Sequence, residues 1–129
     1  MSAAHSVSRR LRAVDELSPQ AVQAVTELID EAAREDGQPA VSEQGRLQLR
    51  KRRPGVRHLL AYEGDELAGY AQLEAAPASG DPVEPPAAEL VVHPRYRFRG
   101  HGRALGQALL AESGHRLRLW AHGGHPAAR

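Results

Sequence analysis

The hydrophobic and polar positions at the start of the chain predict a strand followed by a helix. Residues 9–14 (RRLRAV) alternate polar and apolar side chains, as a short half-buried strand does. Ser18 then suits a helix N-cap, Pro19 suits the first helical position, and Gly37 suits the end of a helix. Between these signals, apolar residues recur at helical spacing, at Val22, Val25, Ile29 and Ala32. The pattern therefore predicts a helix between Ser18 and Gly37.

The middle of the chain predicts a second, shorter helix and then a β-hairpin. Ser42 is a suitable cap for the short helix. In residues 56–76, two strand-like runs flank Gly64-Asp65, a dipeptide that favours a tight turn. Residues 77–86 contain four prolines, which indicates a surface loop.

The last third of the chain predicts one βαβ unit. Residues 88–94 have the apolar pattern of a buried strand, and residues 95–102 form a basic loop with two glycines. A helix with an apolar stripe follows over residues 103–113, and residues 117–121 suit another strand. The whole chain is expected to follow the order β-α-α-β-β-β-α-β. This is an α/β (α+β) fold, with flanking helices around a mixed central sheet.

Composition limits the classes of function. The 129 residues suffice for one domain, and the 41% of apolar residues, with a single Phe and a single Trp, predict an aliphatic core. The 17 basic and 16 acidic residues nearly cancel, so neither nucleic acid nor a membrane surface is an expected partner. The absence of cysteine excludes disulfides and thiol catalysis. With no secretory signal and no spanning apolar run, the expected location is the cytoplasm.

The loop before the last predicted helix has the features of an anion-binding site. A helix N-terminus presents unpaired N–H groups and the positive end of the helix dipole, which together suit a pyrophosphate. Gly100 and Gly102 allow close approach to phosphate oxygens, and Arg97 and Arg99 add charged donors. The sequence lacks the Gly-Lys-Ser/Thr of a P-loop, and Leu105 replaces the third glycine of a Rossmann loop. On these residues alone, a plain strand-to-helix turn is the alternative.

Three other groups of residues each allow a functional and a simpler interpretation. His122 and His125 have a spacing that suits metal ligands, but the glycines between them indicate a turn, and no metal is expected. The basic run at 50–53 could contact nucleic acid or be a solvated helix end. Tyr96 and Phe98 could stack on bases, whereas burial of one ring beneath the loop is the simpler interpretation.

The spacing Arg97-x-x-Gly100-x-Gly102 resembles the signature R/Q-x-x-G-x-G/A of the GNAT N-acetyltransferases. Residues 88–97 (AELVVHPRYR) are similar to the fourth strand of that family, and the predicted element order follows the GNAT scheme. The resemblance implies acetyl-CoA as the acyl donor, without a metal. It implies a pyrophosphate cradle formed by Arg97, Phe98, Arg99, Gly100, His101 and Gly102. It also implies that the pantetheine arm bonds to the backbone of Leu90, Val91 and Val92.

Within the family, the chain is most similar to the N-terminal half of members that have two such domains in tandem. Those members acetylate the cysteinyl amine of a pseudodisaccharide. The resemblance therefore implies a small amine as the acceptor and a second GNAT domain, in cis or in trans, as the partner. A GNAT domain continues beyond its fifth strand with a helix and two more strands. Residues 1–129 are therefore expected to form a single, incomplete domain that lacks them.

Two carboxylates are candidates for roles in the transfer. Glu43 resembles a residue that contacts the substrate ammonium, and an ordinary first-turn residue after Ser42 is its alternative. Glu89 lies on the strand where a general base would act, and its alternatives are a rim carboxylate or an ion-pair partner of Arg97. In tandem members the N-terminal domain is regarded as degenerate. The alternative function is therefore a non-catalytic acyl-CoA-binding half that supports a catalytic domain.

Overall fold

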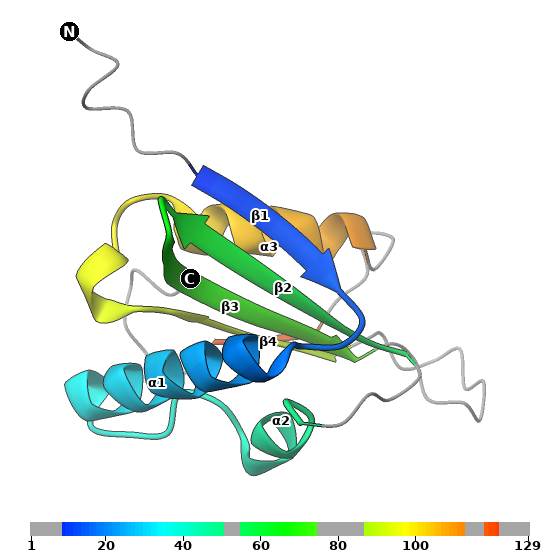
Figure 1. Cartoon of the computed structure of the whole chain (residues 1–129), viewed down its shortest axis with the longest axis horizontal. Helices are drawn as coiled ribbons and strands as arrows, with labels where there is room; N and C mark the ends of the chain where they lie inside the picture. The colour runs from blue at the N-terminus through cyan, green and yellow to red at the C-terminus, as the bar shows by residue number, and fades with distance from the viewer. Residues whose placement is uncertain (1–8, 51–54, 75–86, 113–117, 122–129) are drawn as a thin grey trace, which may run out of the picture.

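A central sheet organises the computed structural model, which describes residues 9–50, 55–74, 87–112 and 118–121 (Figure 1). In these ranges five strands lie in the order β1-β2-β3-β4-β5. Their bounds are β1 (Arg9–Val14), β2 (Val56–Glu63), β3 (Glu66–Glu74), β4 (Ala87–Val92) and β5 (Arg118–Ala121). The first four strands pair antiparallel, while β4 and β5 pair parallel. The predicted element order and the mixed sheet are thus confirmed.

Helix α1 (Pro19–Asp36) has the ends that the sequence predicts. The Ser18 hydroxyl accepts a hydrogen bond from the N–H of Ala21 at 3.1 Å. At the other end, Gly37 adopts a left-handed φ of 71° and donates its N–H to the carbonyl of Ala33. The buried side of α1 packs on one face of the sheet, through Val25, Leu28, Ile29 and Ala32.

Two further helices complete the layers. The short α2 (Glu43–Leu47) lies with α1 on one side of the sheet, and α3 (His101–Glu112) covers the other side (Figure 1). Leu105 and Leu109 of α3 are fully buried against the apolar faces of β2, β3 and β4. Both cores are largely aliphatic, as the composition predicts.

The predicted start of α3 at residue 103 is two residues too late, because the helix begins at His101. The His101 ring is buried and hydrogen-bonded to a carboxylate of β2, which fixes this residue against the sheet. Gly100 accepts the first helical hydrogen bond, from the N–H of Ala104 at 3.0 Å. The second glycine of the motif therefore lies inside the first helical turn.

Several sequence predictions concern residues outside the described ranges. They are the surface loop at 77–86, most of the basic run at 50–53, and the pair His122 and His125. No helix in the described ranges is long and apolar enough to cross a membrane. In the same ranges, no group of three or more His, Cys, Asp or Glu side chains could hold a metal ion.

Candidate functional site

The chain between β4 and α3 turns sharply and presents the N-terminus of α3. A short 3-10 helix, η2 (Pro94–Tyr96), follows β4, and the loop then contains two left-handed residues, Phe98 (φ 65°) and Gly100 (φ 88°). Left-handed backbone is natural for glycine and uncommon for phenylalanine, so this loop is a constrained turn. The first N–H groups of α3 have no carbonyl partner within the helix, and the first turn contains Arg103 but no acidic residue. The helix end is therefore strongly electropositive.

Arg97, the arginine of the motif, has a structural role in the fold. Its Nη1 and Nη2 donate to Asp36 at 2.7 and 2.8 Å, and its Nε donates to the carbonyl of Val92. The two charged side chains are 9% and 7% exposed, and the hydrogen bond that Arg97 donates to Asp36 raises the pKa of Arg97. This pair connects the C-terminal end of α1 to the loop. Because the guanidinium of Arg97 is engaged within the protein, only the backbone of this residue can contact a ligand.

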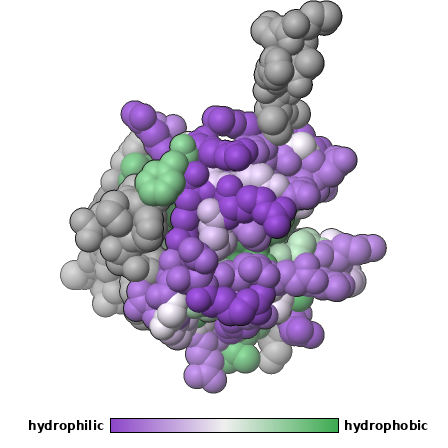
Figure 2. All heavy atoms as spheres, turned by 90° about the vertical axis from the view of Figure 1, so that its left-hand side faces the viewer, coloured by the Kyte–Doolittle hydropathy of each residue, from purple (hydrophilic) through white to green (hydrophobic). Residues whose placement is uncertain are grey.

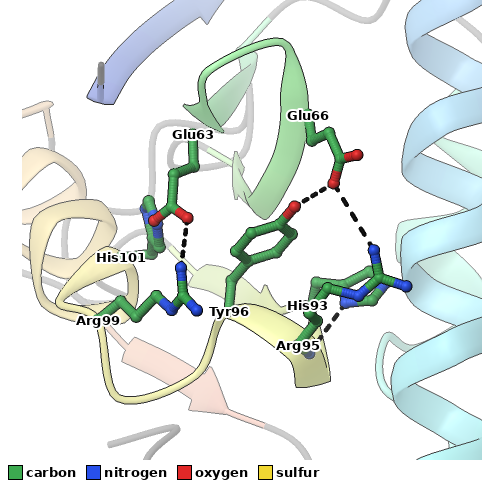
Figure 3. A network of polar contacts seen from close by, with 7 residues as sticks. All are labelled: Glu63, Glu66, His93, Arg95, Tyr96, Arg99 and His101. Carbon is green, nitrogen blue, oxygen red and sulfur yellow. Dashed lines mark hydrogen bonds and ion pairs between the residues drawn. The ribbon is translucent and has the colours of Figure 1, made fainter. Parts of the chain in front are cut away.

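Arg99 and His101 share one buried carboxylate (Figure 3). The Nη1 of Arg99 lies 2.6 Å from Glu63, and the Nε2 of His101 lies 3.0 Å from the other oxygen of the same carboxylate. The hydrogen bond from His101, assisted by the charge of Arg99, lowers the pKa of Glu63. The Arg99 side chain is 48% exposed, whereas that of His101 is 3% exposed. Arg99 can therefore reach a ligand, but His101 can offer only its main-chain N–H.

Tyr96 connects the loop to the β2–β3 hairpin (Figure 3). Its hydroxyl donates to the carboxylate of Glu66, next to the hairpin turn, and its ring stacks under the guanidinium of Arg99 at 5.4 Å. Tyr96 is buried, while Phe98 is 80% exposed. The prediction that one of these two rings is buried beneath the loop is thus confirmed. The hairpin holds the loop in place through Glu63 and Glu66.

A groove beside the loop has the wrong charge for phosphates. It has a volume of about 530 Å³ and lies between α1 and the start of β3, on the hydrophilic face shown in Figure 2. Glu27, Glu31 and Glu66 are among its lining residues. Because carboxylates repel phosphate groups, this groove does not suit a phosphate ligand.

Beyond Leu90, the described residues place no strand beside β4 on the side that faces away from β3. Leu90 pairs with Ala121 of β5, and this is the last pair between these two strands in the described ranges. Val91 and Val92 continue to pair with β3 on the other side, opposite Tyr70 and Gly69. Main-chain groups alternate sides along a strand, and the N–H of His93 bonds to the carbonyl of Ala68 in β3. The groups of Val91 therefore face β3, whereas those of Val92 face away from it. Because the Val92 carbonyl accepts from Arg97, the N–H of Val92 is the better placed group for a ligand.

Glu89 is held by the segment between α1 and α2. The main-chain N–H of Ser42 donates to Oε1 of Glu89 at 2.7 Å, and the Ser42 hydroxyl donates to Oε2 at 2.6 Å. The same hydroxyl accepts the N–H of Gly45 at 3.0 Å, which caps α2. Glu43 is exposed beside this cluster. The structure therefore brings the two candidate carboxylates to one place, on either side of Ser42.

A buried polar chain, which the sequence did not reveal, supports this cluster from below. Gln72 donates to the carbonyl of Gly45 and to the hydroxyl of Tyr70, each at 3.0 Å. The Tyr70 oxygen lies 2.6 Å from Nδ1 of His58. Burial raises the pKa of Tyr70 and lowers that of His58, so the phenol keeps its proton and donates it to a neutral imidazole. In the sequence, only the alternating positions of these polar residues along β2 and β3 pointed to the buried hydrogen-bonded network.

The comparisons with known proteins agree on one family. The model of the acetyltransferase (GNAT) family matches residues 22–129. The mycothiol acetyltransferase of Streptomyces avermitilis is 67% identical over 122 residues, which cover 94% of this chain and 38% of that protein. The chain thus spans well under half the length of this curated relative and corresponds to its N-terminal part.

Solved structures support the same fold. The ribosomal-protein-S18-alanine N-acetyltransferase of Escherichia coli superposes with a TM-score of 0.67 at 17% identity, covering 94% of this chain and 72% of that one. The protein yncA of Salmonella typhimurium, whose structure contains acetyl-CoA, superposes with a TM-score of 0.59 at 23% identity. That match covers 82% of this chain and 63% of the other chain.

Proposed function

The chain belongs to the GNAT acetyltransferase family, and from this premise we propose that it binds acetyl-CoA as the donor for N-acetylation of a small amine. The observation that carries the proposal is the electropositive N-terminus of α3, presented by the constrained loop at 97–100. Its free N–H groups would hold the pyrophosphate, with the exposed guanidinium of Arg99 as a further donor. The proposed location is the cytoplasm.

The proposed path of the coenzyme follows from the backbone groups that remain free. The pantetheine arm would bond to the main-chain N–H of Val92, on the side of β4 that faces away from β3. This path runs from the α3 N-terminus toward the middle of β4. It brings the thioester near Glu89 and the segment that contains Ser42 and Glu43.

The proposed reaction is direct acyl transfer. The nitrogen of a neutral amine attacks the thioester carbonyl carbon, the amide bond forms, and coenzyme A leaves as its thiolate. Glu89 would accept a proton from the incoming ammonium through a water molecule, and exposed Glu43 would attract the positive charge of the acceptor. The proposed acceptor is the cysteinyl amine of Cys-GlcN-Ins, as the family resemblance implies, and the name of the relatives, mycothiol acetyltransferase, supports a role in mycothiol biosynthesis.

A second candidate function has its own support. Both oxygens of Glu89 already accept hydrogen bonds from Ser42, an arrangement that suits an anchor as well as a base. The chain also spans only 38% of the Streptomyces avermitilis relative. The second candidate is therefore a half that binds acyl-CoA and supports a second GNAT domain, in cis or in trans, which performs the catalysis.

Calorimetry followed by product analysis tests the proposal. The chain is titrated with acetyl-CoA and, as a control, with acetyl-pantetheine, which lacks the pyrophosphate, the 3′-phosphate and the adenosine. Clearly tighter binding of acetyl-CoA is expected, and equal affinities would overturn the assignment of the loop. Cys-GlcN-Ins is then added and the amide is measured by chromatography, because the thiol of the acceptor masks that of released coenzyme A. Binding without amide formation favours the non-catalytic half.

A further inference from the structure

Arg9, at the start of β1, lies beside the loop before α3, although β2 and β3 separate β1 from β4 in the sheet. In the sheet, Arg9 lies opposite Glu63, whose carboxylate contacts Arg99. A β-carbon at Gly100 would lie 3.7 Å from Nη1 of Arg9, so the guanidinium lies next to the open space beside Gly100. Figure 1 shows the start of β1 and the start of α3 at the same end of the sheet.

The strand alternation separates Arg9 from its basic neighbours. Val14 of β1 packs with the core beneath α1, and side chains at even positions of a strand share one face. Arg10 accordingly lies over the ring of Tyr62, which packs against the same core. Arg9 is at an odd position and faces the side of α3, whereas Arg12 faces the side of α1.

Among the described residues, the positive charges around this point outnumber the negative ones. Arg9, Arg99 and Arg103 all lie at or beside the positive end of α3. The one carboxylate in this cluster, Glu63, already binds Arg99 and His101 through its two oxygens. Among the residues that the structure describes, none accepts a hydrogen bond from the guanidinium of Arg9. An exposed cation beside two others and a helix N-terminus favours an anionic ligand.

We propose that Arg9 binds the ribose 3′-phosphate of acetyl-CoA and makes the chain selective for coenzyme A over its 3′-dephospho form. The inference rests on the proposed function and deepens it. Coenzyme A carries a pyrophosphate and a separate 3′-phosphate, and the pyrophosphate occupies the N–H groups of α3 and the Arg99 side chain. The 3′-phosphate is a second dianion that needs its own donors, and the two-pronged guanidinium of Arg9 matches phosphate geometry. Its exposed place at the sheet edge suits the nucleotide end of the coenzyme.

Calorimetry with a pair of coenzymes tests the assignment. Acetyl-CoA and acetyl-3′-dephospho-CoA are titrated into the wild type, Arg9→Gln and Arg12→Gln. Arg12→Gln is the matched control, since it removes the same charge from the same strand but on the opposite face. We expect the wild type to prefer acetyl-CoA by about tenfold, as for one charge-assisted contact at an exposed site. Arg9→Gln should lose this preference, while Arg12→Gln should keep it.

The outcomes separate this inference from the proposed function. If Arg9→Gln lowers the affinity for both coenzymes equally, Arg9 acts on the pyrophosphate or through the electrostatic field of the site. The 3′-phosphate assignment is then wrong. Equal affinities of the wild type for the two coenzymes would overturn it as well, while leaving the loop assignment intact. Failure of the wild type to bind either coenzyme would overturn the proposed function together with the inference. Unchanged thermal melting of Arg9→Gln verifies that the exposed substitution preserves the fold.

Discussion

Ser42 holds both carboxylate oxygens of Glu89, one through its main-chain N–H and the other through its hydroxyl. The contact joins the loop after α1 to strand β4, across 47 residues of sequence. Because the same hydroxyl caps α2, the position of Glu89 and the start of that helix depend on one side chain. Glu89 is therefore anchored before any acceptor arrives.

Removal of the Ser42 hydroxyl should weaken the fold at this junction. Ser42→Ala loses a helix cap and one hydrogen bond to Glu89, and the expected decrease in the free energy of unfolding is about 1–2 kcal/mol. Urea unfolding measures the change. Glu43→Ala, at the neighbouring exposed position, is the control and should change stability by less than about 0.5 kcal/mol. Equal effects of the two variants would show that the Ser42 contact is unimportant.

The buried pair of Asp36 and Arg97 should be costly to break. Asp36→Ala removes the carboxylate that pairs with the buried guanidinium of Arg97. The expected decrease in the free energy of unfolding is about 3 kcal/mol. Glu35→Ala, one position earlier and exposed, serves as the control and should be nearly neutral. Chemical denaturation of both variants measures the difference. If the free energy of unfolding of Asp36→Ala decreases by less than about 1 kcal/mol, the buried guanidinium of Arg97 does not depend on Asp36.

Stability should depend on pH through Glu63. The hydrogen bond from His101 is the largest cause that lowers the pKa of this carboxyl below its ordinary value of 4.5. The folded state therefore binds the proton less readily than the unfolded state. The stabilising contribution is fully present above pH 4.5 and is lost as the pH falls through the lower, folded value.

Thermal melting of the wild type and of Glu63→Gln between pH 3 and pH 7 measures this contribution, at roughly half-unit steps. The two melting temperatures should differ most at neutral pH and converge in acid. Glu27→Gln, at an exposed position on α1, is the control and should follow the wild type at every pH. A difference between wild type and Glu63→Gln that stays constant down to pH 3 would contradict the account.

Local signals in the sequence were sufficient for the elements but not for the contacts that build the site. Ser18, Pro19 and Gly37 placed the ends of α1 because caps act within a few residues. In contrast, Arg97 meets Asp36 across 61 residues, and their pairing depends on how α1 lies on the sheet. One hint was available, since an acidic residue in the last helical turn opposes the dipole and thus favours a partner elsewhere.

The start of α3 shows the same limit. The motif around Gly100 identified the loop, but the buried contact of His101 with β2, 38 residues away, extends the helix by two residues. A motif of glycines and arginines indicates which conformations the loop backbone can adopt. The tertiary contacts decide which side chains remain available, and here they engage Arg97 and His101 and leave Arg99 exposed.

The most direct test of the central claim, that the loop before α3 holds the phosphates of acetyl-CoA, compares two glycine variants by calorimetry. Gly100 and Gly37 both have left-handed backbone, so Gly100→Glu and Gly37→Glu add the same strain and the same negative charge. Only Gly100→Glu places the carboxylate at the proposed phosphate site, and it should weaken acetyl-CoA binding by about tenfold or more, because like charges repel. Gly37→Glu should bind as the wild type does. Equal affinities of the two folded variants would contradict the claim.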